Sequence, residues 1–212
     1  MTAPARLVVA LLSDTAFSRG EPTATEVDVE VEHDEHGLPF LGGKALHGLL
    51  RDTWLTLEPQ FSALRSAAGR VLGAPGDLGE SAILRIDHAT LPPEVSGWIA
   101  HAVTRHDARL PARDVLRALT DVRSQTAEER ATGAPARGTL RRVRVALRGL
   151  ELSAMLTWLE PPQADDVRLL ALCALGTRHG GLGRNRGLGH LGLSLDGDRA
   201  RTVAIATGKA QP

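Results

Sequence analysis

The stretch GGLGRNRGLGHLGLSL, residues 180–195, constrains the fold more than any other part of the chain. Five of its first ten residues are glycine, which adopts positive φ readily and lets another backbone approach closely. No Gly-Lys-Ser/Thr sequence follows, which excludes a Walker A loop. A dinucleotide-binding fingerprint is disfavoured, because the glycine spacing is off by one and a predicted helix, not a strand, precedes it.

Two interpretations of this glycine-rich loop remain open. A helix C-cap followed by a turn would explain Gly180 or Gly181. It would not explain five glycines interspersed with arginines. In the second interpretation the glycines admit a foreign backbone, while Arg184 and Arg186 contact phosphate groups.

The spacing of apolar residues predicts an α+β chain with an antiparallel sheet. Helices and strands mix without the regular alternation of a doubly wound parallel sheet. Residues 121–138 have no hydrophobic period, which predicts a long loop or an extended hairpin, and such segments are usually functional. Strands are expected at 6–13, 26–32, 81–86, 139–147, 150–158, 190–195 and 202–206, and helices directly after 42–43 and at 59–72, from 92, at 111–119 and at 164–176.

Composition excludes several classes of protein. The 25 basic and 25 acidic residues give a formal net charge of zero, which argues against nucleic-acid binding through global charge. Cys173 is the only cysteine, so no disulfide within the chain and no cysteine-based metal site is expected, and its apolar neighbours predict a buried thiol. No apolar run is long enough to span a bilayer, and no signal peptide is recognised, so we expect a soluble, cytoplasmic protein.

Two groups of basic residues suggest phosphate binding. Aromatic residues make up only 3% of the chain, so nucleic-acid binding would depend on arginine, backbone amides and shape. The predicted helix after Gly42-Gly43 carries Lys44, His47 and Arg51 on its first turns, where a phosphate site and a plain amphipathic helix are equally compatible with the spacing. A cluster of arginines, which indicates either phosphate contacts or a solvated face, comprises Arg123, Arg130, Arg137, Arg141, Arg142, Arg144 and Arg148.

The segment EVDVEVE, residues 26–32, alternates between valine and acidic residues and predicts a half-buried strand with an acidic outer face. Carboxylates on such a face bind a hard divalent metal or activate a nucleophile. An exposed strand edge that is protected against aggregation has the same pattern. The two alternatives stay open on the pattern alone.

Three segments together resemble the RAMP superfamily of CRISPR-associated proteins. LPFLGGKALHGLLRD resembles the element that opens the first helix of that superfamily. VRSQTAEERATGAPARGTLRRVRV resembles its thumb segment, and GGLGRNRGLGHLGL resembles its C-terminal glycine-rich loop. The order and spacing of the three agree, and the resemblance spans residues 6–206.

The resemblance implies a ferredoxin-like, RRM-related single domain over residues 1–212 with a thumb inserted at 121–142. It also implies a guide-RNA-binding subunit of a type III effector complex that stacks along the crRNA. The implied partners are crRNA, target RNA and other CRISPR effector subunits. The expected RNA-binding residues are Lys44, His47, Arg51, Arg123, Arg137, Arg141, Gly181, Gly183, Arg184, Arg186 and Gly187.

In the type III backbone family an aspartate shortly before the first motif cuts target RNA with a divalent metal. Alignment on Pro39 and Gly48 places that position at Val27, and a shift of one residue brings in Asp28 or Glu26. We expect Asp28 to be the catalytic residue and the ligand of Mg²⁺ or Mn²⁺. The alternatives are a non-catalytic end subunit that caps the 5′ tag of the crRNA and, outside the family, a stand-alone metal-dependent hydrolase.

Overall fold

The structure is a computed structural model that describes residues 2–18, 27–74, 81–105, 110–129, 131–134, 136 and 138–209. Strands and helices follow one another in a mixed order, as the sequence predicts. The strands are β1 (Arg6–Leu11), β2 (Leu84–Ile86), β3 (Thr120–Gln125), β4 (Arg141–Ala146), β5 (Glu151–Trp158) and β6 (Leu191–Leu195). The helices are α1 (Gly43–Leu57), the 3₁₀ turn η1 (Ser62–Leu64), α2 (Arg65–Leu72), α3 (Pro93–Thr104), α4 (Ala112–Leu119), α5 (Ala164–Gly176) and α6 (Arg199–Ala206).

Four strands form an antiparallel sheet in the order β2-β5-β1-β6. Helix α1 connects β1 to β2, and α5 connects β5 to β6, so each pair of edge and centre strands belongs to a split β-α-β unit. This order is that of a ferredoxin-like fold. The predicted α+β class with an antiparallel sheet is therefore confirmed.

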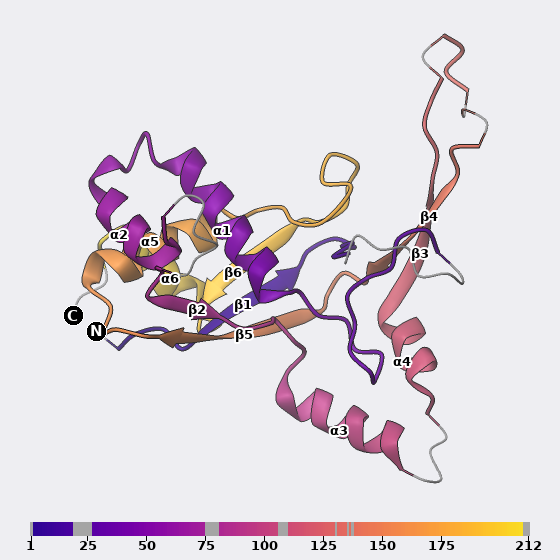
Figure 1. Ribbon diagram of the computed structural model, residues 1–212, viewed down its shortest axis with the longest axis horizontal. Coiled ribbons are helices and arrows are strands. Elements are labelled where there is room, and N and C mark those ends of the chain that lie inside the picture. The colour runs from indigo at the N-terminus through magenta and orange to yellow at the C-terminus, as the bar shows by residue number, and fades with distance from the viewer. Residues whose placement is uncertain are drawn as a thin grey trace.

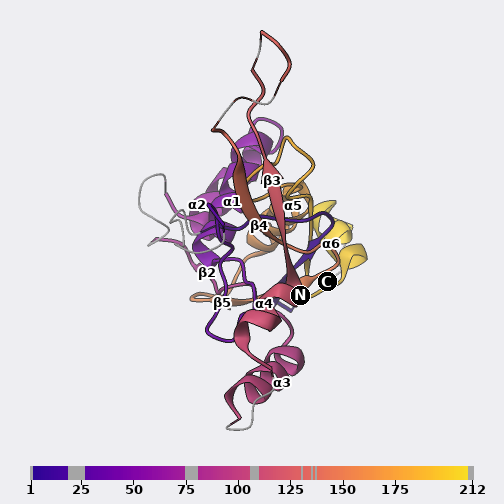
Figure 2. The ribbon, with the colours of Figure 1, turned by 90° about the vertical axis from the view of Figure 1, so that its right-hand side faces the viewer.

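The helices α1, α2, α5 and α6 lie on one face of this sheet (Figures 1 and 2). Alternate residues of β1, such as Leu7 and Val9, are fully buried against that layer. Helix α1 contributes Leu46 and Leu50 to the same core, because residues four apart share one face of a helix. The sheet and these helices therefore share one hydrophobic core.

Strands β3 and β4 pair outside this sheet and form the base of an extended hairpin, which we call the thumb (residues 120–146). The thumb stands away from the sheet, and α3 and α4 project in the opposite direction (Figure 1). Thr15 bridges Ala146, which attaches the thumb base to the segment that follows β1. The sequence predicts either a long loop or an extended hairpin for residues 121–138. The pairing of β3 with β4 shows that it is a hairpin.

Two predicted strands are wrong. Residues 202–206 belong to helix α6, because the Asp198 side chain accepts a hydrogen bond from the Arg201 backbone N–H and caps its start. Residues 27–32 form isolated bridges instead of a regular strand, although Val27 and Val31 are buried as the alternation predicts. Glu26 lies outside the described residues.

Cys173 is buried in α5, as expected, and burial raises the pKa of its thiol to about 12. The thiol therefore stays protonated and unreactive at neutral pH. None of the helices in the described part of the chain is both long and apolar enough to cross a membrane.

Candidate nucleic-acid interface

The glycine loop (residues 178–190) leaves the end of α5 and returns to β6, and backbone contacts close its base. The Gly180 N–H donates to the Gly189 carbonyl (2.9 Å), and the Leu182 N–H donates to the Ala16 carbonyl (3.0 Å). Gly189 has φ +73°, and a Cβ at this position would collide with the carbonyl oxygen of Gly180. A Cβ at Gly181, which has φ +78°, would likewise collide with the Ala16 carbonyl oxygen. Close backbone approach within the chain therefore explains two of the five glycines.

The tip of the loop carries its two arginines into solvent. The Arg186 N–H donates to the Gly183 carbonyl (2.8 Å) and makes a tight turn, with Gly183 at φ +71° and Gly187 at φ +81°. Arg184 and Arg186 are exposed. Within the described ranges their guanidinium groups have no hydrogen bond or ion pair. Their charges are free to bind an anion.

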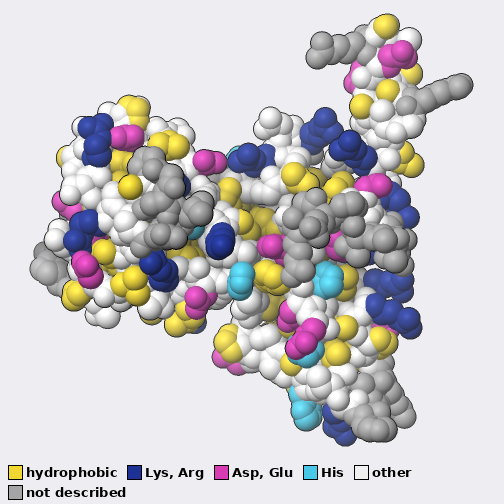
Figure 3. Space-filling model, in the orientation of Figure 1, with side chains coloured by type: hydrophobic (Ala, Val, Ile, Leu, Met, Phe, Trp, Pro, Cys, Tyr) yellow, Lys and Arg dark blue, Asp and Glu magenta, His cyan; other side chains and the backbone are white. Residues whose placement is uncertain are grey.

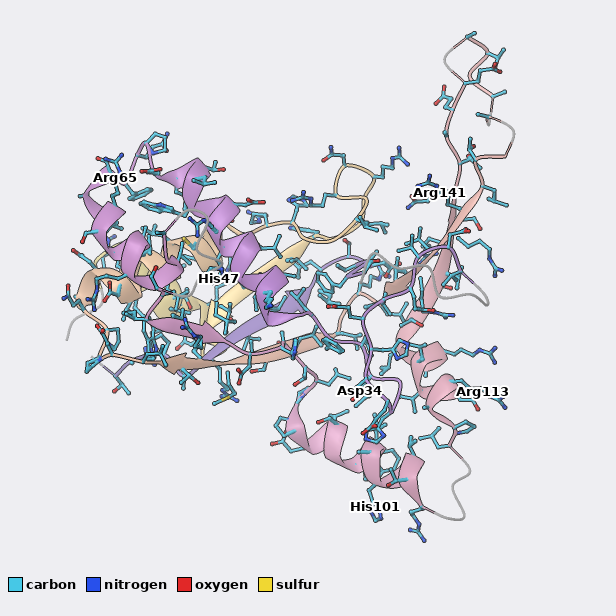
Figure 4. All side chains as sticks on the ribbon, viewed as in Figure 1. Asp34, His47, Arg65, His101, Arg113 and Arg141 are labelled. Atoms are coloured by element: carbon cyan, nitrogen blue, oxygen red, sulfur yellow. The ribbon has the colours of Figure 1, made fainter. Side chains whose placement is uncertain are left out.

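A groove of about 620 Å³ separates the glycine loop from the thumb base. Arg141 points from the thumb toward the loop (Figure 4), and Lys and Arg side chains gather around this part of the surface (Figure 3). Arg141, like the two loop arginines, has no side-chain ion pair or hydrogen bond among the described residues. The groove is lined by Val29, Gln125, Arg141, Val143, His179, Leu182, Gly183, Arg184, Asn185 and Arg186.

Other arginines of the thumb are paired with carboxylates. The Arg123 guanidinium donates to Asp14 and also forms an ion pair with Asp121 (3.2 Å). Burial would raise the pKa of Asp14, but the hydrogen bonds from Arg123 and from the Arg148 N–H outweigh it and lower that pKa. The bond to Asp14 in turn raises the pKa of Arg123. These contacts hold the thumb base, and an RNA contact by Arg123 stays a prediction.

Arg144 is nearly buried and forms an ion pair with Glu30 (2.8 Å), whose side chain is 14% exposed. This pair ties the predicted acidic segment, residues 26–32, to β4. Arg137 and Arg130, which the sequence placed in the same cluster, lie outside the described residues. The predicted arginine cluster therefore divides into structural arginines and open ones.

The start of α1, the second predicted phosphate site, has two of its amide donors occupied. The Gly42 N–H donates to Glu32 Oε2 (3.1 Å), and the Gly43 N–H donates to His88 Nδ1 (3.2 Å). The Glu32 carboxylate stands where an approaching phosphate would meet the positive end of the helix dipole. It would repel that phosphate.

The basic side chains of α1 point in different directions. Arg51 donates to the Leu72 carbonyl (3.2 Å) at the end of α2. His47, one turn earlier, lies on α1 away from the thumb (Figure 4), whereas Lys44 is exposed. None of the three lines the groove. The structure thus brings together Arg141, Gly183, Arg184 and Arg186 of the predicted RNA-binding set, with Gly181 and Gly187 in the same loop.

Asp28 is exposed at the thumb base, next to Val29 of the groove. Its Oδ2 accepts a hydrogen bond from the Arg142 N–H (2.7 Å), and its own N–H donates to the Arg142 carbonyl (2.8 Å). No group of three or more His, Cys, Asp or Glu side chains within the described ranges is arranged to hold a metal ion. The observed contacts of Asp28 anchor β4, and catalysis or metal binding by this residue stays a prediction.

Sequence reasoning missed three polar residues of the groove, Gln125, His179 and Asn185. The ring of His179 stacks on that of His190, with centroids 5.3 Å apart, across the base of the loop. The position of His179 directly before Gly180 of the predicted loop was the available signal. The position of Gln125 depends on the register of the hairpin, which the sequence does not define.

No family model and no curated protein sequence matches this chain. Solved structures share its fold. One is a chain of the type III-B Cmr-beta structure in the apo state, with a TM-score of 0.66 and 12% identity over 93% of this chain and 98% of that one. Another is a chain of type III-B Cmr-beta bound to cognate target RNA, with a TM-score of 0.65 and 12% identity over 91% and 96%. At this identity the likeness establishes the fold.

Proposed function

We propose that this chain is a guide-RNA-binding subunit of a type III CRISPR effector ribonucleoprotein. The observation that carries the proposal is the groove between the glycine loop and the thumb, where Arg141, Arg184 and Arg186 have no ion-pair partner among the described residues. Single-stranded RNA presents a regular row of phosphates, which arginines bind with charge-assisted, often bidentate hydrogen bonds. Contacts of this kind hold an RNA of any sequence.

Two independent features support the assignment to a CRISPR complex. The fold is shared over nearly the full length with chains of type III-B Cmr-beta structures, one of which is bound to cognate target RNA. The three sequence segments that resemble the RAMP superfamily lie at α1, at the thumb and at the glycine loop. Two of these three segments border the groove.

The RNA-binding role is tested by removing the two loop arginines together. The Arg184→Ala, Arg186→Ala variant should bind single-stranded RNA on the order of tenfold more weakly than the wild type. Arg65→Ala combined with Arg113→Ala removes the same charge at exposed sites away from the groove (Figure 4) and should leave the affinity nearly unchanged. Equal affinities of the two double variants, or no RNA binding by the wild-type chain, would contradict the proposal.

We propose that the chain is a backbone subunit, present in several copies along one crRNA. The alternative is an end subunit that caps the 5′ tag in a single copy. Co-purification from a reconstituted operon, with sequencing of the bound RNA and counting of subunits per RNA, separates the two. A single copy at the 5′ tag would exclude the backbone role.

A second candidate function is cutting of target RNA with Asp28 as the catalytic residue and Mg²⁺ or Mn²⁺ as the metal. Asp28 is next to Val29 of the groove, which favours this function, and a shift of one residue from the alignment on Pro39 and Gly48 brings Asp28 to the catalytic position of the superfamily. The test is Asp28→Asn, which retains a side-chain oxygen for the Arg142 N–H. Loss of cutting with unchanged RNA binding supports catalysis, whereas unchanged cutting by this variant leaves Asp28 only the anchoring role.

A further inference from the structure

A second, smaller hollow of about 280 Å³ lies beside the groove, between the start of α1 and the glycine loop. Leu182 lines both the groove and the hollow, so the two adjoin at this residue. The proposed phosphate contacts of the glycine loop and the thumb do not use this hollow. It is lined by Ala16, Phe17, Ser18, Glu32, Leu41, Ala45, Leu49, Gly181 and Leu182.

The walls of this hollow are mostly apolar. Phe17 and Leu41 are buried beneath it, and Leu49 and Leu182 are partly exposed around it. Pockets for drug-sized ligands begin at about 300 Å³, so this hollow suits a single ring system. Its apolar walls and its size disfavour a phosphate and favour a flat base.

Among the described residues that line the hollow, Glu32 is the only charged one. Its Oε2 accepts the hydrogen bond from the Gly42 N–H, which fixes the carboxylate at the edge of the hollow. A carboxylate is an acceptor only, and it therefore pairs with an amino group, such as N4 of cytosine, and not with a keto oxygen. The negative charge would also repel the phosphates of a bound RNA.

We infer that this hollow binds one nucleobase of the RNA whose phosphates lie in the groove, and that Glu32 makes it prefer a base with an exocyclic amino group. The inference rests on the proposed RNA-binding function. It adds a base preference to a surface that otherwise binds the RNA backbone of any sequence. Cytosine is preferred over uracil, which has the same size but presents a keto oxygen at position 4.

The preference is measured with oligocytidylate and oligouridylate of equal length at neutral pH. The wild-type chain should bind oligocytidylate about tenfold more tightly, the discrimination expected from one good contact to a base edge. Equal binding of the two oligonucleotides would overturn the inference.

Glu32→Gln tests the carboxylate directly. The glutamine oxygen retains the bond from the Gly42 N–H, and the amide NH₂ is then available to donate to the uracil keto oxygen. The ratio of the two affinities should fall to about one or reverse in favour of oligouridylate. Glu35→Gln removes the same charge at an exposed position and should retain the wild-type ratio. A cytidine preference that survives Glu32→Gln excludes Glu32 as its source.

Ala45→Leu tests the hollow itself, because Ala45 is exposed on the first turn of α1 and a leucine there would fill the space. The variant should lose the cytidine preference, whereas Ala118→Leu on α4 should retain it. A cytidine preference that survives Ala45→Leu would overturn the inference.

The two proposals fail in different ways. If the loop double variant binds RNA as tightly as the wild type, the proposed function fails. If that variant is weakened but cytidine and uridine oligonucleotides bind equally to the wild type, only the base site fails.

Discussion

Two sets of arginines lie around the thumb of this molecule, and they differ in their partners. Arg123 and Arg144 form ion pairs with Asp14 and Glu30, which come from distant parts of the chain. Arg184 and Arg186, on a loop that glycines close at its base, have no such partner within the described ranges. Both sets consist of arginines in segments that the sequence analysis proposed as phosphate-binding. We call Arg123 and Arg144 the paired set and Arg184 and Arg186 the open set, because only the second has charges without a carboxylate partner among the described residues.

The comparison teaches that an arginine-rich sequence does not by itself define a binding surface. A buried or half-buried arginine needs a carboxylate because an unpaired charge is costly away from water. An exposed arginine on a loop is solvated and needs none until a phosphate arrives. Substitutions should therefore lower the stability in the first set and the RNA affinity in the second.

The largest effect is expected at the glycine that holds the open set in place. Gly189→Ala forces a side chain against the Gly180 carbonyl at positive φ and should lower the free energy of unfolding by about 4 kcal/mol. Gly187 has φ +81° but open space around it, so Gly187→Ala should cost only about 1 kcal/mol. Urea unfolding of both variants checks this, and equal losses would show that the loop base is not tightly closed.

The next largest effect is expected in the paired set. Glu30→Ala removes the carboxylate that pairs with Arg144 at 2.8 Å, in a site where the Arg144 side chain is only 7% exposed, and it should cost about 3 kcal/mol. Glu35→Ala, on the same segment but exposed, should change the stability by less than about 0.5 kcal/mol. A Glu30→Ala variant as stable as Glu35→Ala would remove the distinction between the two sets.

A smaller, pH-dependent effect is expected at Asp14. Its pKa is lowered in the folded chain, so its stabilising contribution is present above its ordinary pKa of 3.8 and is lost as the pH falls through the folded value. Since Arg123 is 48% exposed, screening limits this contribution to about 1 kcal/mol.

Unfolding of the wild type and of Asp14→Asn, followed from neutral to acidic pH, measures this contribution. The variants should differ at neutral pH and converge in acid. A constant difference over the whole range would mean that the Asp14 charge does not stabilise the thumb base.

Much of this fold is encoded locally and was predictable. The apolar period predicts α5 at the residues where it occurs, and the break at Arg148-Gly149 separates β4 from β5. The run Val203–Ile205 alternates as in a strand, and the cap by Asp198 decided for a helix. The apolar pattern alone does not show that the Asp198 side chain will accept the Arg201 N–H and start a helix.

The partners of charged residues were not predictable, because they depend on contacts between remote segments. Asp14 and Arg123 are separated by 109 positions in the chain, and only the fold brings them together. The occupation of the α1 start by Glu32 and His88 has the same origin. The sequence could therefore suggest candidate phosphate sites. It could not show whether the donors of a site are accessible or already bonded to other side chains of the chain.

The salt dependence of RNA affinity tests the central claim most directly. Each phosphate contact on a single strand contributes about 0.7 to the slope of log affinity against log salt, so Arg184→Ala with Arg186→Ala should reduce the slope by about 1.4. Arg123→Ala, which removes an arginine that is already paired, should leave the slope nearly unchanged. Unchanged slope in the loop variant, or an equal loss per arginine in Arg123→Ala, would contradict the division into open and paired arginines.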